Sequence, residues 1–229
     1  MKKYFTVGMF GLCVTLVNLA MTPKGDQPVG VESTIGYFKK NSVQFAQSTA
    51  DLQEKIRKIK AGDPVTLNTA KEALKRCRLQ FKNIEFFLNY FFSSIAIVYN
   101  APPVPEPEEP FLEYRDPTGL QVIAQLLFSS NPERQKKEIL QQVALIRTGA
   151  EDLNSLLYNL PIDDSQILES IRLELISIMT QDIAGFDAPE LKSGISEARQ
   201  TLAAIRTILI PYMDKGGIEA DSIGYYLDA

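Results

Sequence analysis

Histidine is absent from the 229-residue sequence, and its absence removes many familiar kinds of functional site. Histidine is the most frequent general base and metal ligand near neutral pH, so Ser-His-Asp and Cys-His catalytic arrangements cannot form. A His-Glu-x-x-His zinc site and the Cys-x-x-Cys-His attachment motif of c-type haem are excluded for the same reason. These exclusions are the strongest negative statement that the sequence makes.

Cysteine is also scarce, and the two present are Cys13 and Cys77. Cys13 lies in an apolar N-terminal run. If that run is removed, Cys77 is left alone, no intramolecular disulfide can form, and the fold must depend on its core. Because Cys77 falls on an apolar helical stripe, we predict a buried small hydrophobic residue and not a reactive thiol.

An excess of basic residues is also absent: 24 lysines and arginines are outnumbered by 28 aspartates and glutamates, which gives a formal net charge of -4. Nonspecific nucleic-acid binding relies on clustered lysines and arginines, so we expect no nucleic-acid partner. The sequence also has no glycine-rich phosphate loop and no serine-nucleophile elbow. Alternating strand patterns are missing too, which predicts an all-α fold.

The N-terminal residues 1–22 resemble a secretory signal peptide. Lys2 and Lys3 precede a mostly apolar run from Tyr4 to Val17, and small residues follow it. An uncleaved membrane anchor is the alternative, because the apolar run is near the lower limit for spanning a bilayer. We therefore expect an exported protein, periplasmic or anchored facing the periplasm. Its membrane contact would be limited to this segment.

Apolar residues recur at helical spacing through most of the remaining chain. The pattern predicts a bundle domain over residues 31–213, with about five long helices and one short helix, and a flexible tail over 214–229. A proline-rich, acidic loop interrupts the helices near the middle, over residues 99–117. The expected helices cover residues 34–61, 67–95, 119–128, 131–160, 163–183 and 190–210.

The last two helices carry stripes that we expect to face the core. Leu168 and Leu175 lie on the stripe of the segment 163–183, and Ile195 and Leu202 on that of the segment 190–210. Between these helices, Asp182 and Asp187 flank a turn, and helix capping is the simplest role for them.

Charges inside the most aromatic segment, RLQFKNIEFFLNYF, are the main candidates for a site. Arg78, Lys82 and Glu85 share one side of the predicted helix. A helix that is apolar nearly all round is normally central in its bundle, so these charges need partners. They either form a buried structural seam or face a ligand, and the seam is favoured. The seam predicts that Glu85 lies within ion-pair distance of Lys82, of Arg78 or of a base on a neighbouring helix.

Four short motifs, in this order, resemble the all-helical N-terminal region of some bacterial di-haem cytochrome c peroxidase-like proteins. The first has the form Arg-x-x-aromatic-Lys-x-x-Glu with a following Tyr-aromatic pair, and the second is Asn-x-Pro-Pro with acidic residues. The third is Pro-x-Gly-x-Gln-Val, and the fourth is Gly-Phe-Asp-x-Pro. Here they comprise Arg78, Phe81, Lys82, Glu85, Tyr90 and Phe91; Asn100, Pro102, Pro103 and Glu106; Pro117, Gly119, Gln121 and Val122; and Gly185, Phe186, Asp187 and Pro189.

The resemblance implies a non-catalytic helical module, which docks with or scaffolds a di-haem peroxidase or another c-type cytochrome, in cis or in trans. It implies a polar seam at Arg78, Lys82, Glu85, Tyr90, Asn100, Gln121 and Asp187, and no cofactor in this chain. The sequence departs from the family at Ala124, where an acidic residue is expected, and it has no haem-binding segment.

A more distant similarity to imelysin-like helical bundles gives the alternative function. Such a protein would hold iron or haem in the periplasm. The Gly-x-His-x-x-Glu motif of that family cannot occur here, so tyrosines and carboxylates would have to replace histidine, and tyrosine is a known haem ligand. Tyr37, Tyr90 and Tyr99 are the tyrosines considered for this role.

Overall fold

The computed structural model describes residues 28–102, 106–108 and 113–215. The predicted signal peptide or anchor at 1–22 lies outside the described residues, as does the predicted tail beyond Lys215. Among the described helices, none combines the length and the apolar character that crossing a membrane requires.

The described chain is helical almost throughout, which confirms the all-α class. The helices are α2 (Val31–Arg57), α3 (Pro64–Lys82), α4 (Glu85–Phe91), α5 (Ser93–Asn100), α6 (Leu120–Leu127), α7 (Lys136–Glu151), α8 (Asp164–Ser177) and α9 (Gly194–Lys215). A 3-10 turn, η1 (Leu153–Leu157), follows α7, and a π-helical turn, η2 (Ile178–Asp182), continues α8. The two short strands β1 (Glu106–Glu108) and β2 (Glu113–Arg115) pair antiparallel within the proline-rich loop. Their pairing corrects the expectation of a loop without strands.

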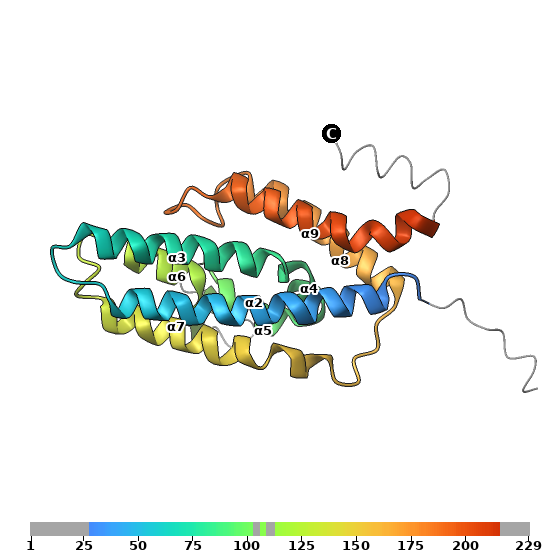
Figure 1. Ribbon diagram of the computed structural model, residues 1–229, viewed down its shortest axis with the longest axis horizontal. Coiled ribbons are helices and arrows are strands. Elements are labelled where there is room, and N and C mark those ends of the chain that lie inside the picture. The colour runs from blue at the N-terminus through green and yellow to red at the C-terminus, as the bar shows by residue number, and fades with distance from the viewer. Residues whose placement is uncertain (1–27, 103–105, 109–112, 216–229) are drawn as a thin grey trace, which may run out of the picture.

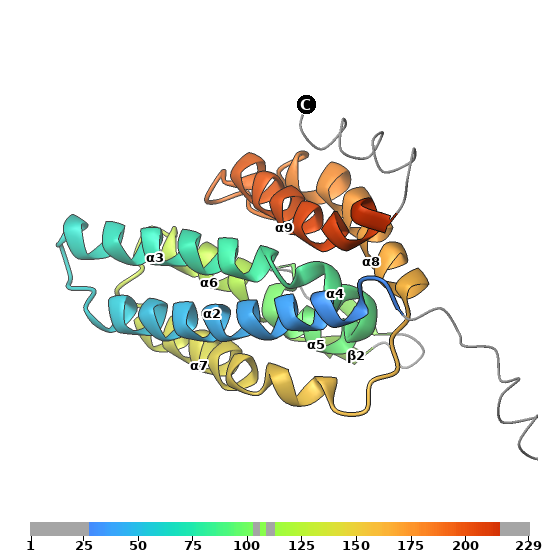
Figure 2. The same cartoon turned by 45° about the vertical axis from the view of Figure 1, so that its right-hand side comes forward.

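The helices form two layers (Figures 1 and 2). In the larger layer α2 packs against α3 and α7, and α6 bridges α3 and α7 on the far side. The helices α8 and α9 make the second layer, in which α9 lies on α3 and α8 lies on α4. The first and last thirds of the chain therefore meet along α3 and α4.

Side-chain caps set two of the helix starts. Asp63 accepts hydrogen bonds from the backbone N–H groups of Val65 and Thr66, and Pro64 occupies the first helical position of α3. Asp163 forms a reciprocal capping box with Gln166 at the start of α8. The predicted cap region at 163–165 is thus confirmed.

The long helix predicted over 67–95 is wrong, because the chain breaks twice within it. Asn83 and Ile84 donate their N–H groups to carbonyls three residues back, which tightens the turn between α3 and α4. A second break falls at Phe92, whose backbone is not helical. The apolar spacing continues across both breaks, so periodicity alone could not reveal them.

The predicted start of the fourth segment near residue 131 is also too early. Arg134 and Gln135 donate N–H bonds to the carbonyls three residues before them, so residues 131–135 form a turn. The α-helix begins only at Lys136.

The core runs through the centre of both layers and is rich in phenylalanine. Phe45, Phe81 and Tyr99 pack as one aromatic cluster between α2, α3 and α5. Cys77 is fully buried, as predicted, and burial raises the pKa of its thiol to about 12, so it stays protonated.

The predicted core stripes of the last two helices are partly wrong. Leu168 and Leu175 of α8, and Ile195 and Leu202 of α9, are exposed. The buried face of α8 is displaced around the helix and includes Ser170 and Glu174. A polar side chain in the interface displaces the apolar stripe from it, and the apolar residues then face outward.

Gly119 provides a test of the junction between α5 and α6. Its φ is +102°, and a Cβ atom there would lie 2.3 Å from the carbonyl oxygen of Tyr99. We expect Gly119→Ala to cost about 2 kcal/mol or more in free energy of unfolding, because both strain and a backbone clash result. Gly36→Ala, at an open helical position of α2, should instead stabilise slightly. Urea denaturation of both variants measures the contrast, and equal effects would contradict the backbone assignment at Gly119.

Candidate functional site

A group of buried charged side chains joins the two layers, and we call it the buried network. Its cations, Arg78 and Lys82, come from the second half of α3. Its carboxylates come from the start of α4, from α8, η2 and the loop after it, and from α9; they are Glu85, Glu174, Asp182, Asp187 and Glu197. Each of these residues is at most 5% exposed.

Arg78 binds Glu197 through two nitrogens. Its Nε lies 2.8 Å from Glu197 Oε1, and its Nη2 lies 2.8 Å from Oε2. The same Nη2 donates to the Asp187 carboxylate at 2.7 Å and to the Asp187 carbonyl oxygen at 3.0 Å. A forked guanidinium suits this geometry, because its donors are planar and fixed. Arg78 therefore joins the loop between η2 and α9, at Asp187, to the first turn of α9, at Glu197.

Lys82 lies one turn further along α3 and contacts three carboxylates. Its Nζ is 2.6 Å from Glu85, 2.8 Å from Asp182 and 2.8 Å from Asp187. The predicted proximity of Glu85 to Lys82 is confirmed, but the pair spans the break between α3 and α4. Burial lowers the pKa of a lysine, yet these carboxylates outweigh it and hold the pKa of Lys82 well above its ordinary value.

Asp187 is the residue on which most partners converge. In addition to both cations, its Oδ1 accepts from Asn100 Nδ2 at 2.7 Å and from Gln121 Nε2 at 3.0 Å. Burial alone would raise the pKa of Asp187, but Arg78 and Lys82 outweigh that effect and hold it far below its usual range. Asp187 is therefore ionised at any physiological pH.

The remaining carboxylates outnumber the available positive charge. Five buried carboxyl groups share two cations, so burial is only partly compensated. Burial raises the pKa of Glu85 to about 7 and raises the pKa of Glu174 and of Asp182 as well. Glu174 Oε1 and Asp182 Oδ2 have no hydrogen-bond partner. The network thus retains protons that an exposed carboxyl group would release.

The backbone of the α8–α9 turn is shaped to bring these carboxylates inward. The π-helical turn η2 changes the register just before Asp182. Gly185 adopts a φ of +81°, and Gly194 passes so close to the Asp182 carbonyl that a Cβ would lie 2.0 Å from it. This close approach permits α9 to start beside η2.

The structure places the predicted seam residues together, with one exception. Arg78, Lys82, Glu85, Asn100, Gln121 and Asp187 all belong to the network or contact it directly. Tyr90 does not; its ring packs edge-on against Phe91 and is half-buried.

Three other carboxylates of the network, Glu174, Asp182 and Glu197, are not among the residues predicted for the seam. The capping role predicted for Asp182 and Asp187 is wrong for both, because their carboxylates bind Lys82 and Arg78; for Asp187 only the resemblance predicts a place in the seam. Glu197 was missed, although one sequence signal points to it. It shares its helix face with Gly194, Ala198 and Thr201, small residues on a buried face where a carboxylate needs a partner.

Three carboxylates of the network lie close enough together to suggest a metal site. Asp182, Asp187 and Glu197 offer carboxylate oxygens that all lie within 4.8 Å of one another. Arg78 and Lys82 already bind these groups, and their ammonium and guanidinium charges would repel a cation placed between them. The arrangement therefore fits internal ion pairing better than metal coordination.

Comparison with models of known protein families finds no matching family, and a search of curated proteins finds no match. The similarity to the peroxidase-associated helical region accordingly remains a prediction that is based on the four motifs.

Proposed function

We propose that this chain is an exported, non-catalytic helical module that docks with or scaffolds a di-haem cytochrome c peroxidase or another periplasmic electron-transfer protein. One observation supports the proposal most. The four motifs that carry the resemblance are far apart in sequence, yet each supplies a member or direct partner of the buried network: Arg78, Asn100, Gln121 and Asp187. Residues that match a family in sequence and also meet in space are expected if that family's internal arrangement is shared.

The enclosure of the network favours a non-catalytic role. Acid–base catalysis needs a carboxyl group within hydrogen-bond reach of a substrate. Glu85 and Glu174 have perturbed pKa values but are at most 5% exposed. Perturbed carboxyl groups also occur in structural ion-pair networks, and the buried location fits that role.

The alternative, a haem- or iron-binding protein that uses tyrosine, finds less support. Tyrosine ligates haem iron as the phenolate, which a low pKa favours. Burial instead raises the pKa of Tyr37 to about 12 and raises that of Tyr99 further. Tyr99 is 1% exposed, and its ring packs against Phe45 and Phe81 in the aromatic cluster.

A binding experiment tests the proposal. We expect the purified chain to bind a purified bacterial di-haem cytochrome c peroxidase with a saturable isotherm in titration calorimetry. The chain mixed with haemin should show no Soret shift. Absence of binding to the peroxidase at about 100 µM of each protein, a concentration that covers weak transient complexes, would contradict the docking role. A saturable Soret shift would favour the haem-binding alternative.

A further inference from the structure

Exposed apolar side chains gather on the second layer. Among the described residues, ten of the large apolar side chains that are exposed lie between Asp164 and Lys215, and four lie elsewhere. Scattered exposed apolar residues need no explanation, but a concentration on one layer marks an interaction surface.

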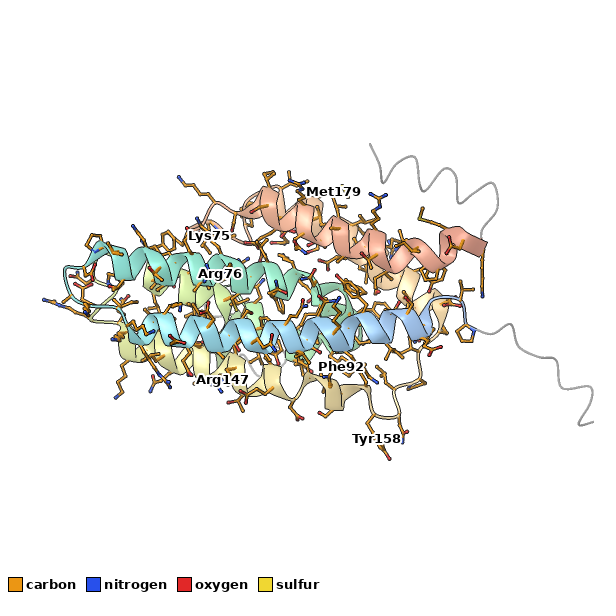
Figure 3. All side chains as sticks on the ribbon, viewed as in Figure 1. Lys75, Arg76, Phe92, Arg147, Tyr158 and Met179 are labelled. Atoms are coloured by element: carbon orange, nitrogen blue, oxygen red, sulfur yellow. The ribbon has the colours of Figure 1, made fainter. Side chains whose placement is uncertain are left out.

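The most exposed members of this set lie around the turn between α8 and α9. They are Met179, Ile183, Phe186 and Ile195, which are 61%, 55%, 71% and 70% exposed, and we call them the tip patch. Figure 3 shows Met179 on the outer side of this layer, away from the larger bundle. Ile183 and Ile195 line one surface pocket of about 240 Å³ together with Ala188 and Pro189. Asp182 also lines it, but its carboxylate is buried and pairs with Lys82. The pocket is large enough for one apolar side chain from a partner.

The charge beside the pocket is mainly positive. Lys192 lines the pocket and is exposed, and Arg199 follows Ile195 by one turn on the same face of α9. Neither has an ion-pair partner within the described part of the chain. Glu190 is the exposed acid of this turn. The exposed charged groups beside the pocket are therefore two cations and one acid, a positive balance in a chain whose net charge is -4.

The buried network fixes the backbone that carries the tip patch. Arg78 binds the carbonyl and the carboxylate of Asp187, the residue after Phe186. Lys192 has a φ of +52°, a strained value for a residue other than glycine. The loop is therefore held in place by the buried network while its outer surface is apolar. Binding to a surface that is already ordered loses little conformational entropy.

From these observations we infer that the tip patch is the docking surface of the module, and that it binds a protein partner which inserts an apolar side chain beside carboxylates. The inference rests on the proposed function, since it names the surface and the chemistry of the partner. The concave pocket favours a protein over a bilayer, because a lipid surface offers no single side chain to fill it.

Two synthetic peptides test the inference without any natural partner. One is an amphipathic helix with leucines on one face and glutamates beside them, and the other has lysines in place of the glutamates. We expect the acidic peptide to bind the full chain at least tenfold more tightly in fluorescence anisotropy. The double variant Phe186→Ser/Ile195→Ser should reduce that binding at least tenfold. Tyr158→Ser, at an exposed aromatic on the opposite side of the molecule (Figure 3), should leave it unchanged.

The outcomes separate the surface from the proposed function. Equal binding of the two peptides, or unchanged binding by the double variant, would contradict the assignment of the tip patch as a docking surface, whether or not the peroxidase binds. Binding to phosphatidylglycerol-containing vesicles in place of the acidic peptide would overturn it in favour of a lipid surface. If the acidic peptide binds at the tip patch and the peroxidase does not bind, the docking surface is supported and the peroxidase is excluded as the partner. If the peroxidase binds the double variant as tightly as the wild type, the proposed function is supported but the tip patch is not the docking surface.

Discussion

Replacing Arg78 by methionine is expected to lower the free energy of unfolding by about 3–5 kcal/mol, the loss typical of a broken buried ion pair. Methionine fills a similar volume, so the effect comes from charge and hydrogen bonds more than from a cavity. The change would leave Asp187 and Glu197 with less compensation, at 5% and 0% exposure. It would also remove the donor to the Asp187 carbonyl. Chemical denaturation followed by circular dichroism measures the loss.

Arg76→Met is the matched control for this variant. Arg76 lies on the same helix two residues earlier and pairs with Asp51 at 2.9 Å, but its side chain is 57% exposed (Figure 3). An exposed pair of this kind contributes at most about 1 kcal/mol. The double variant Arg78→Met/Glu197→Gln should recover part of the loss, because it removes one uncompensated charge. If Arg78→Met costs no more than Arg76→Met, the buried network does not hold the two layers together.

The fold class could be predicted because apolar spacing reports helices over long stretches. The same signal failed at Asn83 and Phe92, where the stripe continues although the helix does not. Periodicity reports which side chains face the core. It does not report a single tightened turn, in which the backbone changes and the buried face does not.

The candidate site could be half predicted for a similar reason. Arg78, Lys82 and Glu85 stand out because charge is rare within an apolar segment. Their partners do not stand out, because Asp182 and Asp187 lie in a turn where carboxylates are ordinary caps, and only the resemblance places Asp187 in the seam. Which carboxylate pairs with a buried cation depends on how α9 packs against α3. Helical spacing within one segment contains no information on that packing.

Several apolar residues of α8 and α9 that were predicted to be buried are exposed, and they lie on the layer that carries the proposed docking surface. Sequence spacing predicted a buried face at Leu168 and Leu175, but the interface instead contains Glu174 and Ser170. Polar side chains therefore occupy part of an interface between layers that apolar side chains usually fill. The apolar residues that they displace are then free to face a partner.

Raising the pH from 5 to 8 is expected to lower the free energy of unfolding by about 2–3 kcal/mol through Glu85 alone. Burial raises the pKa of Glu85 from 4.5 to about 7, so the folded chain keeps a proton that the unfolded chain releases. The stability from that proton is fully present below the unfolded pKa and is lost as the pH rises through the folded pKa. The pKa values of Glu174 and Asp182 are raised as well, so protonation of these groups also favours the folded chain. Asp187 shifts oppositely, so its contribution disappears only in acid.

Glu85→Gln isolates this effect, because glutamine has the shape of the protonated side chain and cannot titrate. We expect the variant to keep a smaller pH dependence between 5 and 8, with the remainder assigned to Glu174 by the variant Glu174→Gln. Glu133→Gln changes an exposed carboxyl group and should leave the wild-type profile intact. Urea denaturation at several pH values gives the profiles. If the wild type becomes more stable from pH 5 to 8, or if Glu85→Gln retains the full slope, the excess carboxylates do not hold protons in the folded chain.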